Sequence, residues 1–298
     1  MRPFRSLLVA ASVLAVSLPG CATAPDARPA GTSGPALWKA ADEDTTVYLF
    51  GTVHALPENV EWYRGEVESA LTGADVLVTE IPASAMKDPV SQQIVMKRAL
   101  LSAGQSLRDM LSDEQRATFE AALASLSMPP AAFDRFEPWF AALTLSILPL
   151  TQNGWTPEMG VETVIDERAG PDKRRDAFET LDGQMALFDS LPQDAQIEYL
   201  MATTEQLDQV LPSMDRMVAE WAAGDAVLLA ELMNDSMTDP ELANILLYRR
   251  NANWAQWIDD RMEQPGTVFV AVGAGHLAGT RSVQDYLAER GIKVTRVQ

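Results

Sequence analysis

The stretch that decides the fold is TTVYLFGTVH, residues 45–54. Its β-branched and aromatic residues predict a strand, and the glycine behind them ends that strand. A second strand is predicted over residues 74–81, and residues 60–71 between the two have helical composition. A strand, a helix and a strand in this order predict a β-α-β unit with parallel pairing and a right-handed connection.

The middle of the chain predicts a long helical section, from about residue 91 to residue 262. Ala, Leu, Met, Gln and Glu dominate this section, and its apolar residues recur every three or four positions. Residues 139–149 are strongly apolar but too few to span a membrane, so they predict a buried helix. One short strand is expected at residues 176–181.

Strand composition returns near the C-terminus in GTVFVAV, residues 266–272. A helix is expected over about residues 280–290 and a last strand over residues 291–297. We therefore predict an α/β fold with a mixed, mainly parallel sheet built from the N- and C-terminal segments, and a large helical insertion between them. The folded domain is expected to cover residues 37–298.

The N-terminus has the layout of a secretory signal peptide, predicted over residues 1–20. Arg2 and Arg5 precede an apolar run, and LPGC comes after it at residues 18–21. This tetrapeptide resembles the lipobox of bacterial lipoproteins, in which the cysteine is lipidated and becomes the mature N-terminus. We expect lipidation at Cys21 and an anchor in the outer membrane that faces the periplasm. Ordinary signal cleavage further on and an uncleaved anchor are the alternatives.

A flexible tether is predicted to join the lipid anchor to the folded domain. Residues 21–36 are small and rich in proline and glycine, and they have almost no large apolar side chains. Such composition is typical of a linker that forms no core of its own.

Composition narrows the class of partner. The 298 residues are 47% hydrophobic, which is enough for a core, and the formal net charge is −19. This charge repels nucleic acid and anionic lipid headgroups. We therefore expect a small-molecule or peptide substrate, no nucleic-acid partner, and membrane contact through the N-terminal lipid only. Cys21 is the single cysteine, so a disulfide framework and a thiolate metal cluster are excluded.

The two histidines of the chain sit in matching frames, GTVH ending at His54 and GAGH ending at His276. Each frame comes directly after a predicted strand, so the glycine would turn the chain and place the histidine over the carboxyl edge of the sheet. Glu80 ends another predicted strand and is expected at the same edge. Each of the three side chains alone is also typical of a structural role, as a hydrogen-bonded histidine or a capping carboxylate.

Two imidazoles and a carboxylate suit three roles. They could hold a divalent ion of the Mn, Co, Zn or Fe type, which would lower the pKa of a bound water. Without a metal, one histidine could deprotonate water while Glu80 orients it. The third role is binding without turnover. The sequence contains none of the HExxH, GxSxG and phosphate-loop motifs that mark the common zinc peptidases, serine hydrolases and nucleotide hydrolases.

The paired Gly-x-x-His elements, with TEI at residues 79–81 after the first, resemble the TraB/GumN family, whose relatives include the TIKI proteases. The likeness runs from about residue 37 to residue 298. It includes GVE at 160–162, ET at 179–180, FDSLP at 188–192 and RN at 250–251. The resemblance implies the fold shared with erythromycin esterase and the ChaN haem-binding lipoproteins, and metal-dependent peptidase chemistry with Mn or Co.

Carried over position by position, the resemblance implies that His54, Glu80 and His276 are metal ligands or catalytic groups. Glu162, which stands where many relatives carry Asp, would be a fourth ligand; a solvent-facing helix residue is the alternative. Arg250 would stabilise an oxyanion or hold a substrate carboxylate, with Asn251 in support. A helix-surface ion pair is the alternative for Arg250.

These expectations define a metal-assisted or His/Glu-assisted hydrolase that acts on an amide, peptide or ester bond. One alternative is a haem- or metal-binding lipoprotein of the ChaN type that catalyses no reaction. Another alternative is an accessory protein in polysaccharide export.

Overall fold

The computed structural model of the chain describes residues 28–236 and 240–298. The predicted signal peptide, Cys21 and the first part of the tether lie outside the described residues. The strands are β1 (Leu37–Ala41), β2 (Thr45–Thr52), β3 (Val76–Thr79), β4 (Arg174–Ala177), β5 (Gly266–Gly273) and β6 (Val294–Arg296).

The helices occupy most of the rest of the chain. The α-helices are α1 (Glu66–Gly73), α2 (Pro89–Ala99), α3 (Leu107–Met110), α4 (Asp113–Ser125), α5 (Pro138–Gln152), α6 (Val161–Ala169), α7 (Leu181–Asp189), α8 (Gln193–Glu205), α9 (Val210–Ala223), α10 (Ala226–Ser236), α11 (Pro240–Ala243), α12 (Arg249–Met262) and α13 (Val283–Glu289). The shorter helical turns are η1 (Ala83–Met86), η2 (Pro157–Met159), η3 (Leu207–Gln209), the π-helical η4 (Asn244–Tyr248) and η5 (Ala274–Leu277).

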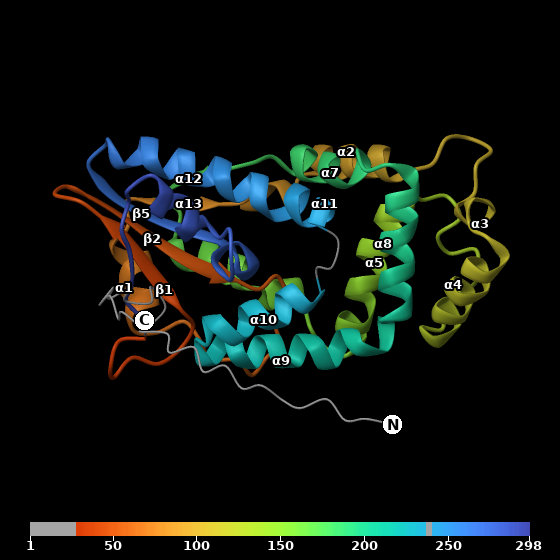
Figure 1. The fold of residues 1–298 in the computed structure, drawn as a ribbon, viewed down its shortest axis with the longest axis horizontal. Coiled ribbons are helices and arrows are strands. Elements are labelled where there is room, and N and C mark those ends of the chain that lie inside the picture. Colours follow the sequence, from red (N-terminus) through yellow and green to blue (C-terminus); the bar gives the residue numbers. More distant parts are fainter. Residues whose placement is uncertain (1–27, 237–239) are drawn as a thin grey trace, which may run out of the picture.

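The described residues form one six-stranded sheet in the order β4-β3-β5-β2-β1-β6. β4, β3, β5 and β2 are parallel, whereas β1 pairs antiparallel with both β2 and β6. Figure 1 shows β2, from the N-terminal part of the chain, lying beside β5 from the C-terminal part. The prediction of a mixed, mainly parallel sheet built from both ends of the chain is therefore confirmed.

The two strands of the predicted β-α-β unit do not pair with each other. β5 lies between them and pairs in parallel with β2 on one side and with β3 on the other. The reason is that β5 is the most apolar strand, with residues 268–272 all buried, and the centre of a sheet covered on both faces suits such a strand best.

Each face of the sheet carries its own hydrophobic core. One core packs Phe50 and Phe269 against α1, α6 and α9. The other packs Val47 and Val268 against α12 and α13. Because successive strand residues point to opposite faces, alternate residues of one strand belong to the two different cores.

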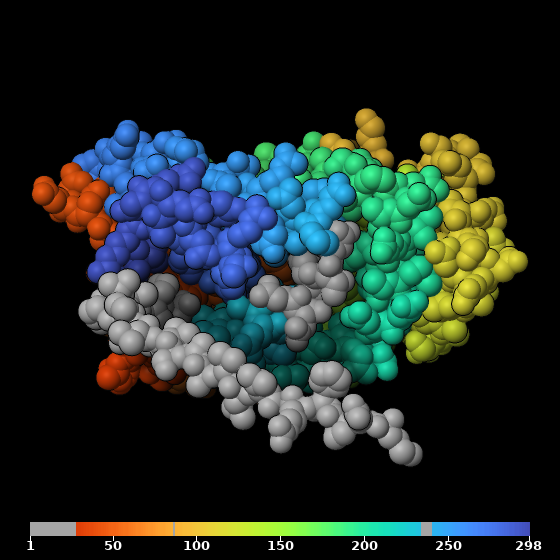
Figure 2. All heavy atoms as spheres, in the orientation of Figure 1, coloured from red at the N-terminus to blue at the C-terminus, as the bar shows by residue number. Residues whose placement is uncertain are grey.

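A third core holds the helical lobe together, and this lobe lies beside the sheet rather than over it. Buried residues of α4, α5 and α8 form this core, including Phe119, Leu145 and Leu200. Figures 1 and 2 show these helices at one end of an elongated molecule and the sheet at the other. No helix in the described part of the chain is both long and apolar enough to cross a bilayer.

Two predicted boundaries are wrong, each for a local reason. The helix expected from residue 60 begins at Glu66, because Gly65 has a φ of 63°, which a right-handed helix cannot contain. The strand expected at residues 176–181 is β4, at Arg174–Ala177. β4 is an exposed edge strand with the sequence RRDA, so it lacks the apolar alternation that sequence reasoning uses.

The described part of the predicted tether contacts the domain. Arg28 donates hydrogen bonds to the carbonyl oxygens of Gly34 and Ala223. Gln298 Nε2 donates to the carbonyl oxygen of Pro35 over 3.1 Å. The last residues before β1 therefore lie along α9 and the C-terminus of the chain.

Candidate functional site

Four parallel strands end at one edge of the sheet, and a polar side chain lies just beyond the end of each. In sheet order these are Glu179 after β4, Glu80 after β3, His276 after β5 and His54 after β2. The carboxyl edge is where open α/β sheets bind their ligands. The structure thus brings both histidines and Glu80 to one edge, and it adds Glu179.

The turn that carries His54 is fixed from two sides. Trp221 Nε1 on α9 donates a 2.8 Å hydrogen bond to the carbonyl oxygen of Gly51. The backbone N–H of Val161 donates to the carbonyl oxygen of Val53 over 2.9 Å. A side chain on Gly160 would overlap the carbonyl oxygen of His54, so the start of α6 approaches this turn through glycine.

His54 and Glu162 form an acid–base pair at the β2 end of the edge. Nδ1 of His54 lies 2.6 Å from Oε1 of Glu162, which also accepts a 2.6 Å hydrogen bond from Thr52 Oγ1. The His54 side chain is 79% exposed and that of Glu162 is 28% exposed. The Glu162 carboxylate raises the pKa of His54 to about 9, through its charge and through its hydrogen bond to Nδ1. His54 is therefore an accessible imidazolium at neutral pH, with its Nε2 directed away from its carboxylate.

Glu80 occupies the centre of the edge and is fully engaged. Oε1 accepts a 2.7 Å hydrogen bond from the N–H of Gly273, and Oε2 accepts from Arg250 Nη2 at 2.6 Å and Gln184 Nε2 at 2.9 Å. Burial raises the pKa of Glu80, but His276 and Arg250 outweigh burial and lower the pKa to about 2. Glu80 is thus a mostly buried carboxylate that is charged at neutral pH.

Arg250 uses all five of its N–H donors within the protein. Nε and Nη2 bind Glu179 over 2.8 and 2.9 Å, and Nη2 also binds Glu80. Nη1 donates to the carbonyl oxygen of Leu246 over 2.9 Å and lies 3.1 Å from His276 Nε2. This arrangement leaves Arg250 no unused N–H donor for an oxyanion or a substrate carboxylate. That role of Arg250 stays a prediction.

His276 is the buried histidine of the site, and its tautomer is set by its partners. Arginine can only donate, so Nε2 of His276 accepts from Arg250 and Nδ1 carries the proton, which it donates to Asn251 Oδ1 over 2.5 Å. Burial lowers the pKa of His276 to about 3. Asn251 thus contacts His276 and the carbonyl oxygen of Arg281 rather than supporting Arg250.

Three residues without a predicted role complete the network. Glu179 receives the bidentate contact of Arg250 and a 3.0 Å hydrogen bond from Trp254 Nε1. The Trp254 ring lies 4.3 Å from the His276 ring, and Gln184 bridges Glu80 and Glu179. Glu179 had one sequence signal, because it belongs to the ET pair at residues 179–180 that resembles the TraB/GumN family.

The predicted ligands do not fit a divalent ion in this arrangement. The guanidinium of Arg250 occupies the lone pair of His276 Nε2 and one oxygen of Glu80, and its positive charge would repel a metal ion placed between them. Over residues 28–236 and 240–298, no three His, Cys, Asp or Glu side chains are placed to hold a metal. Nε2 of His54 accepts no hydrogen bond from a residue in those ranges. Binding of a divalent metal ion by these residues therefore stays a prediction.

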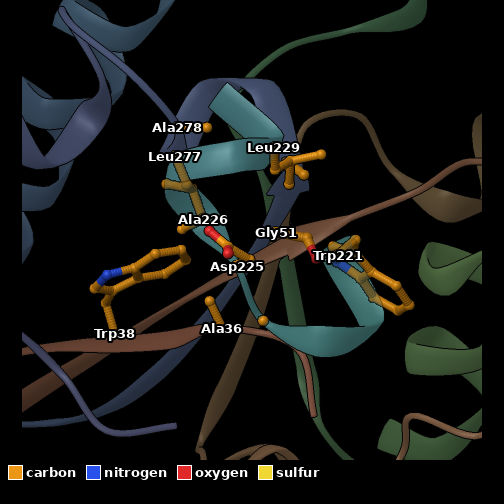
Figure 3. Close-up of a pocket in the computed structure, with 11 residues that line it drawn as sticks. Ala36, Trp38, Gly51, Trp221, Asp225, Ala226, Leu229, Leu277 and Ala278 are labelled. Carbon is orange, nitrogen blue, oxygen red and sulfur yellow. Dashed lines mark hydrogen bonds between the residues drawn. The ribbon is translucent and has the colours of Figure 1, made fainter. Parts of the chain in front are cut away.

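Two hollows lie near the carboxyl ends of the strands, and the larger one is lined by residues of the network. The larger, of about 280 Å³, is lined by Glu179, Thr180, Gly183, Leu187, Ile245, Arg249, Arg250 and Asn253. The smaller lies between β1, the α9–α10 connection and η5, and Figure 3 shows Trp38, Asp225 and Leu277 around it. Its volume of about 10 Å³ has room for about one water molecule, so it is no substrate site.

The fold and this sheet-edge site are those of an α/β protein with two Gly-x-x-His turns. Comparison with known families identifies the family of this protein. The profile of the TraB/PrgY/gumN family matches residues 36–296, so the chain belongs to this family over nearly its whole length. No curated protein matches the chain, and no solved structure does.

Proposed function

We propose that this chain is a hydrolase that cleaves an amide or ester bond with His54 as its proton-transferring group. One observation carries the proposal: His54 is an exposed imidazole whose Nδ1 is held by a carboxylate and whose Nε2 points away from it, beside a buried Glu80–Arg250–His276 network. A carboxylate on Nδ1 fixes the tautomer and orientation that a general base needs.

In the proposed reaction, neutral His54 takes a proton from water at Nε2. The water oxygen bonds to the substrate carbonyl carbon, and the carbon–nitrogen or carbon–oxygen bond of the leaving group breaks. Nε2 then returns the proton to the leaving nitrogen or oxygen, which balances the reaction. Glu162 stabilises the imidazolium that forms between these two steps. Glu80, Arg250 and His276 are positioning residues that hold the strand ends at this edge.

The raised pKa of His54 gives the proposal a distinctive pH profile. Because His54 must lose a proton before it can act as a base, kcat/KM is expected to rise with pH, with its midpoint near pH 9 and a plateau above that pH. In Glu162→Gln the midpoint is expected to move down toward 6.5, because the carboxylate that holds the proton is gone, and the plateau is expected to fall. A profile that is flat from pH 6 to 9 in the parent chain would contradict the role of His54.

The proposal is tested with a panel of peptide and ester substrates, assayed with the full chain and two variants. His54→Asn removes the base from an exposed position, so the fold is expected to survive. Glu58→Gln changes another exposed residue four positions further along the same loop and is the matched control. Turnover in the parent and in Glu58→Gln, reduced about 100-fold or more in His54→Asn, supports the proposal. Turnover that His54→Asn retains would refute it.

A second candidate is metal or haem binding without turnover, because an imidazole anchored through Nδ1 and open at Nε2 is also the arrangement of a metal ligand. Elemental analysis and a haem titration of the parent chain test this candidate, with His54→Asn beside it. Near-stoichiometric metal, or a Soret band, that is lost in His54→Asn favours binding.

We also propose that the chain is exported and held at the outer membrane by a lipid on Cys21. LPGC at residues 18–21 behind a basic and apolar N-terminus supports this proposal. Incorporation of labelled palmitate into the parent chain but not into Cys21→Ser is the expected result. Equal labelling of the two chains would contradict lipidation at this cysteine.

A further inference from the structure

The larger hollow next to the network has a composition suited to a ligand. Apolar side chains of Leu187 and Ile245 form part of its wall, and Gly183 contributes no side chain. Polar groups of Arg249 and Asn253 complete it. A volume of about 280 Å³ is near the lower end of the range for ligand pockets, which suits one group of a larger molecule.

One helical face supplies three of the lining residues. Ile245, Arg249 and Asn253 recur every four positions, and Arg250 lies beside them. The chain passes from the π-helical η4 into α12 at this point. π-Helical turns are rare in proteins, and those that occur are often found at functional sites. A π turn changes which side chains share one face of the helix. Here the face next to the Arg250 network opens onto the hollow.

Arg249 and Asn253 are uncommitted, in contrast to Arg250. Neither side chain has a hydrogen-bond or ion-pair partner within residues 28–236 and 240–298, and both residues are exposed. Glu179 also lines the hollow, but it shares the single positive charge of Arg250 with Glu80. Arg249 is therefore the cation that lines the hollow without an ion-pair partner within residues 28–236 and 240–298, so it can form one with a ligand.

The hollow lies at the opposite end of the sheet edge from His54. It adjoins Glu179 after β4, whereas His54 lies after β2, and β3 and β5 lie between. Three strand spacings of about 4.8 Å place these two ends about 14 Å apart, which is the length of about four residues of extended chain. A ligand that reaches both ends must be elongated.

We propose that this hollow binds the carboxylate of an extended, peptide-like ligand, with Arg249 and Asn253 as its hydrogen-bond donors and the rest of the ligand directed along the sheet edge toward His54. The inference rests on the proposed function for the orientation of the ligand, since His54 marks the reacting end. The binding itself is independent of turnover.

Calorimetry with two probes tests the inference. The probes are N-acetyl-tetraalanine with a free C-terminal carboxylate and the same peptide as its C-terminal amide. All titrations use the full chain carrying His54→Asn, which prevents turnover through His54 and removes the other exposed cation of the site. In this background Arg249→Gln and Asn253→Ala are compared with Arg216→Gln, an exposed arginine on α9, as the matched control.

The acid is expected to bind about tenfold more tightly than the amide, because a charged hydrogen bond is lost in the amide. This preference is expected to disappear in Arg249→Gln, to weaken in Asn253→Ala and to persist in Arg216→Gln. Equal affinities, no binding of either probe, or a preference that survives Arg249→Gln would each overturn the inference. Hydrolysis is scored separately: a carboxylate preference without turnover in the parent leaves the subsite standing and refutes the hydrolase.

Discussion

The two histidines face opposite electrostatic environments although their sequence frames match. His54 is exposed beside an ionised carboxylate, which stabilises its charged form. His276 is buried against Trp254 and accepts a hydrogen bond from an arginine, so its neutral form is stabilised. At pH 7 the His54 imidazole is therefore charged and can donate a proton, whereas the His276 imidazole is neutral and accepts a hydrogen bond from Arg250. The two histidines are not equivalent ligands.

Proton NMR of the imidazole C–H signals is expected to show this difference directly, because the chain has two histidines. One signal is expected to titrate with a pKa of about 9 and the other with a pKa of about 3, so neither moves at the usual value near 6.5. If the signal that titrates near pH 9 is absent from the spectrum of His54→Asn, that signal belongs to His54. A titration of both signals near 6.5 in the parent chain would disprove the two environments.

The contact between Arg250 and Glu179 is expected to be a large single contributor to the stability of the site. Their side chains are 13% and 19% exposed, so Glu179→Gln would remove two charge-assisted hydrogen bonds from a site that water reaches little, although Glu80 still balances the charge of Arg250. The expected cost is about 2–3 kcal/mol in the free energy of unfolding, measured by urea denaturation.

Asp166→Asn is the matched control for Glu179→Gln, because it breaks another arginine–carboxylate contact, to Arg175, that lies at the surface. Its cost is expected to stay below about 1 kcal/mol, since solvent screens an exposed pair. Equal losses in the free energy of unfolding for the two variants would show that burial of the Arg250 contact adds nothing to its contribution to stability.

At the level of elements, the contact of α6 with the turn after β2 joins two of the site's parts. α6 carries Glu162, and its first N–H binds Val53 next to His54. The close approach depends on Gly160, where a Cβ would overlap the His54 carbonyl oxygen and lie 2.8 Å from its carbon. The position of one helix therefore sets the distance between the histidine and its carboxylate.

Gly160→Ala is expected to separate His54 from Glu162 and to cost about 1–3 kcal/mol of stability, because the backbone must move to admit the methyl group. The NMR pKa of His54 is expected to fall from about 9 toward 6.5 in the same variant. Gly73→Ala, at the end of α1 with nothing within 4 Å of the added carbon, is the control and should change neither quantity. An unchanged His54 pKa in Gly160→Ala would reject this account.

Across the whole molecule, the pKa shifts set the pH at which the fold is most stable. Between pH 3 and 6.5 the unfolded chain protonates His276 while the native chain does not, so stability falls as pH falls through this window. Glu80 adds the same trend between about pH 4.5 and 2. From pH 6.5 to 9 the native chain keeps the proton of His54 longer than the unfolded chain, so stability falls as pH rises.

Stability measured by urea denaturation is therefore expected to peak near pH 6.5–7. His276→Gln is expected to flatten the acid side of the curve, since it removes the group that the unfolded chain protonates. His54→Asn should flatten the alkaline side instead, and by less, because solvent screens an exposed pair. A parent curve that keeps rising to pH 9 would contradict the signs of these shifts.

The sequence by itself determined the fold class and the position of both histidine turns and of Glu80 at the edge. These features depend on local patterns: apolar strands, a glycine three residues before each histidine, and a carboxylate at a strand end. The parallel arrangement of the strands then places the residues beyond their carboxyl ends at one edge. Family membership over residues 36–296 agrees with these local patterns.

Only the tertiary structure decided which groups meet and in which charge state. β5 separates β2 from β3 because the most apolar strand takes the centre of the sheet. Arg250 is committed to Glu179, and Glu162 to His54, through contacts 71 and 108 residues apart in the chain. A pKa depends on burial and on neighbouring charges, and both are set by such long-range packing, so no local pattern could have distinguished the charged histidine from the neutral one.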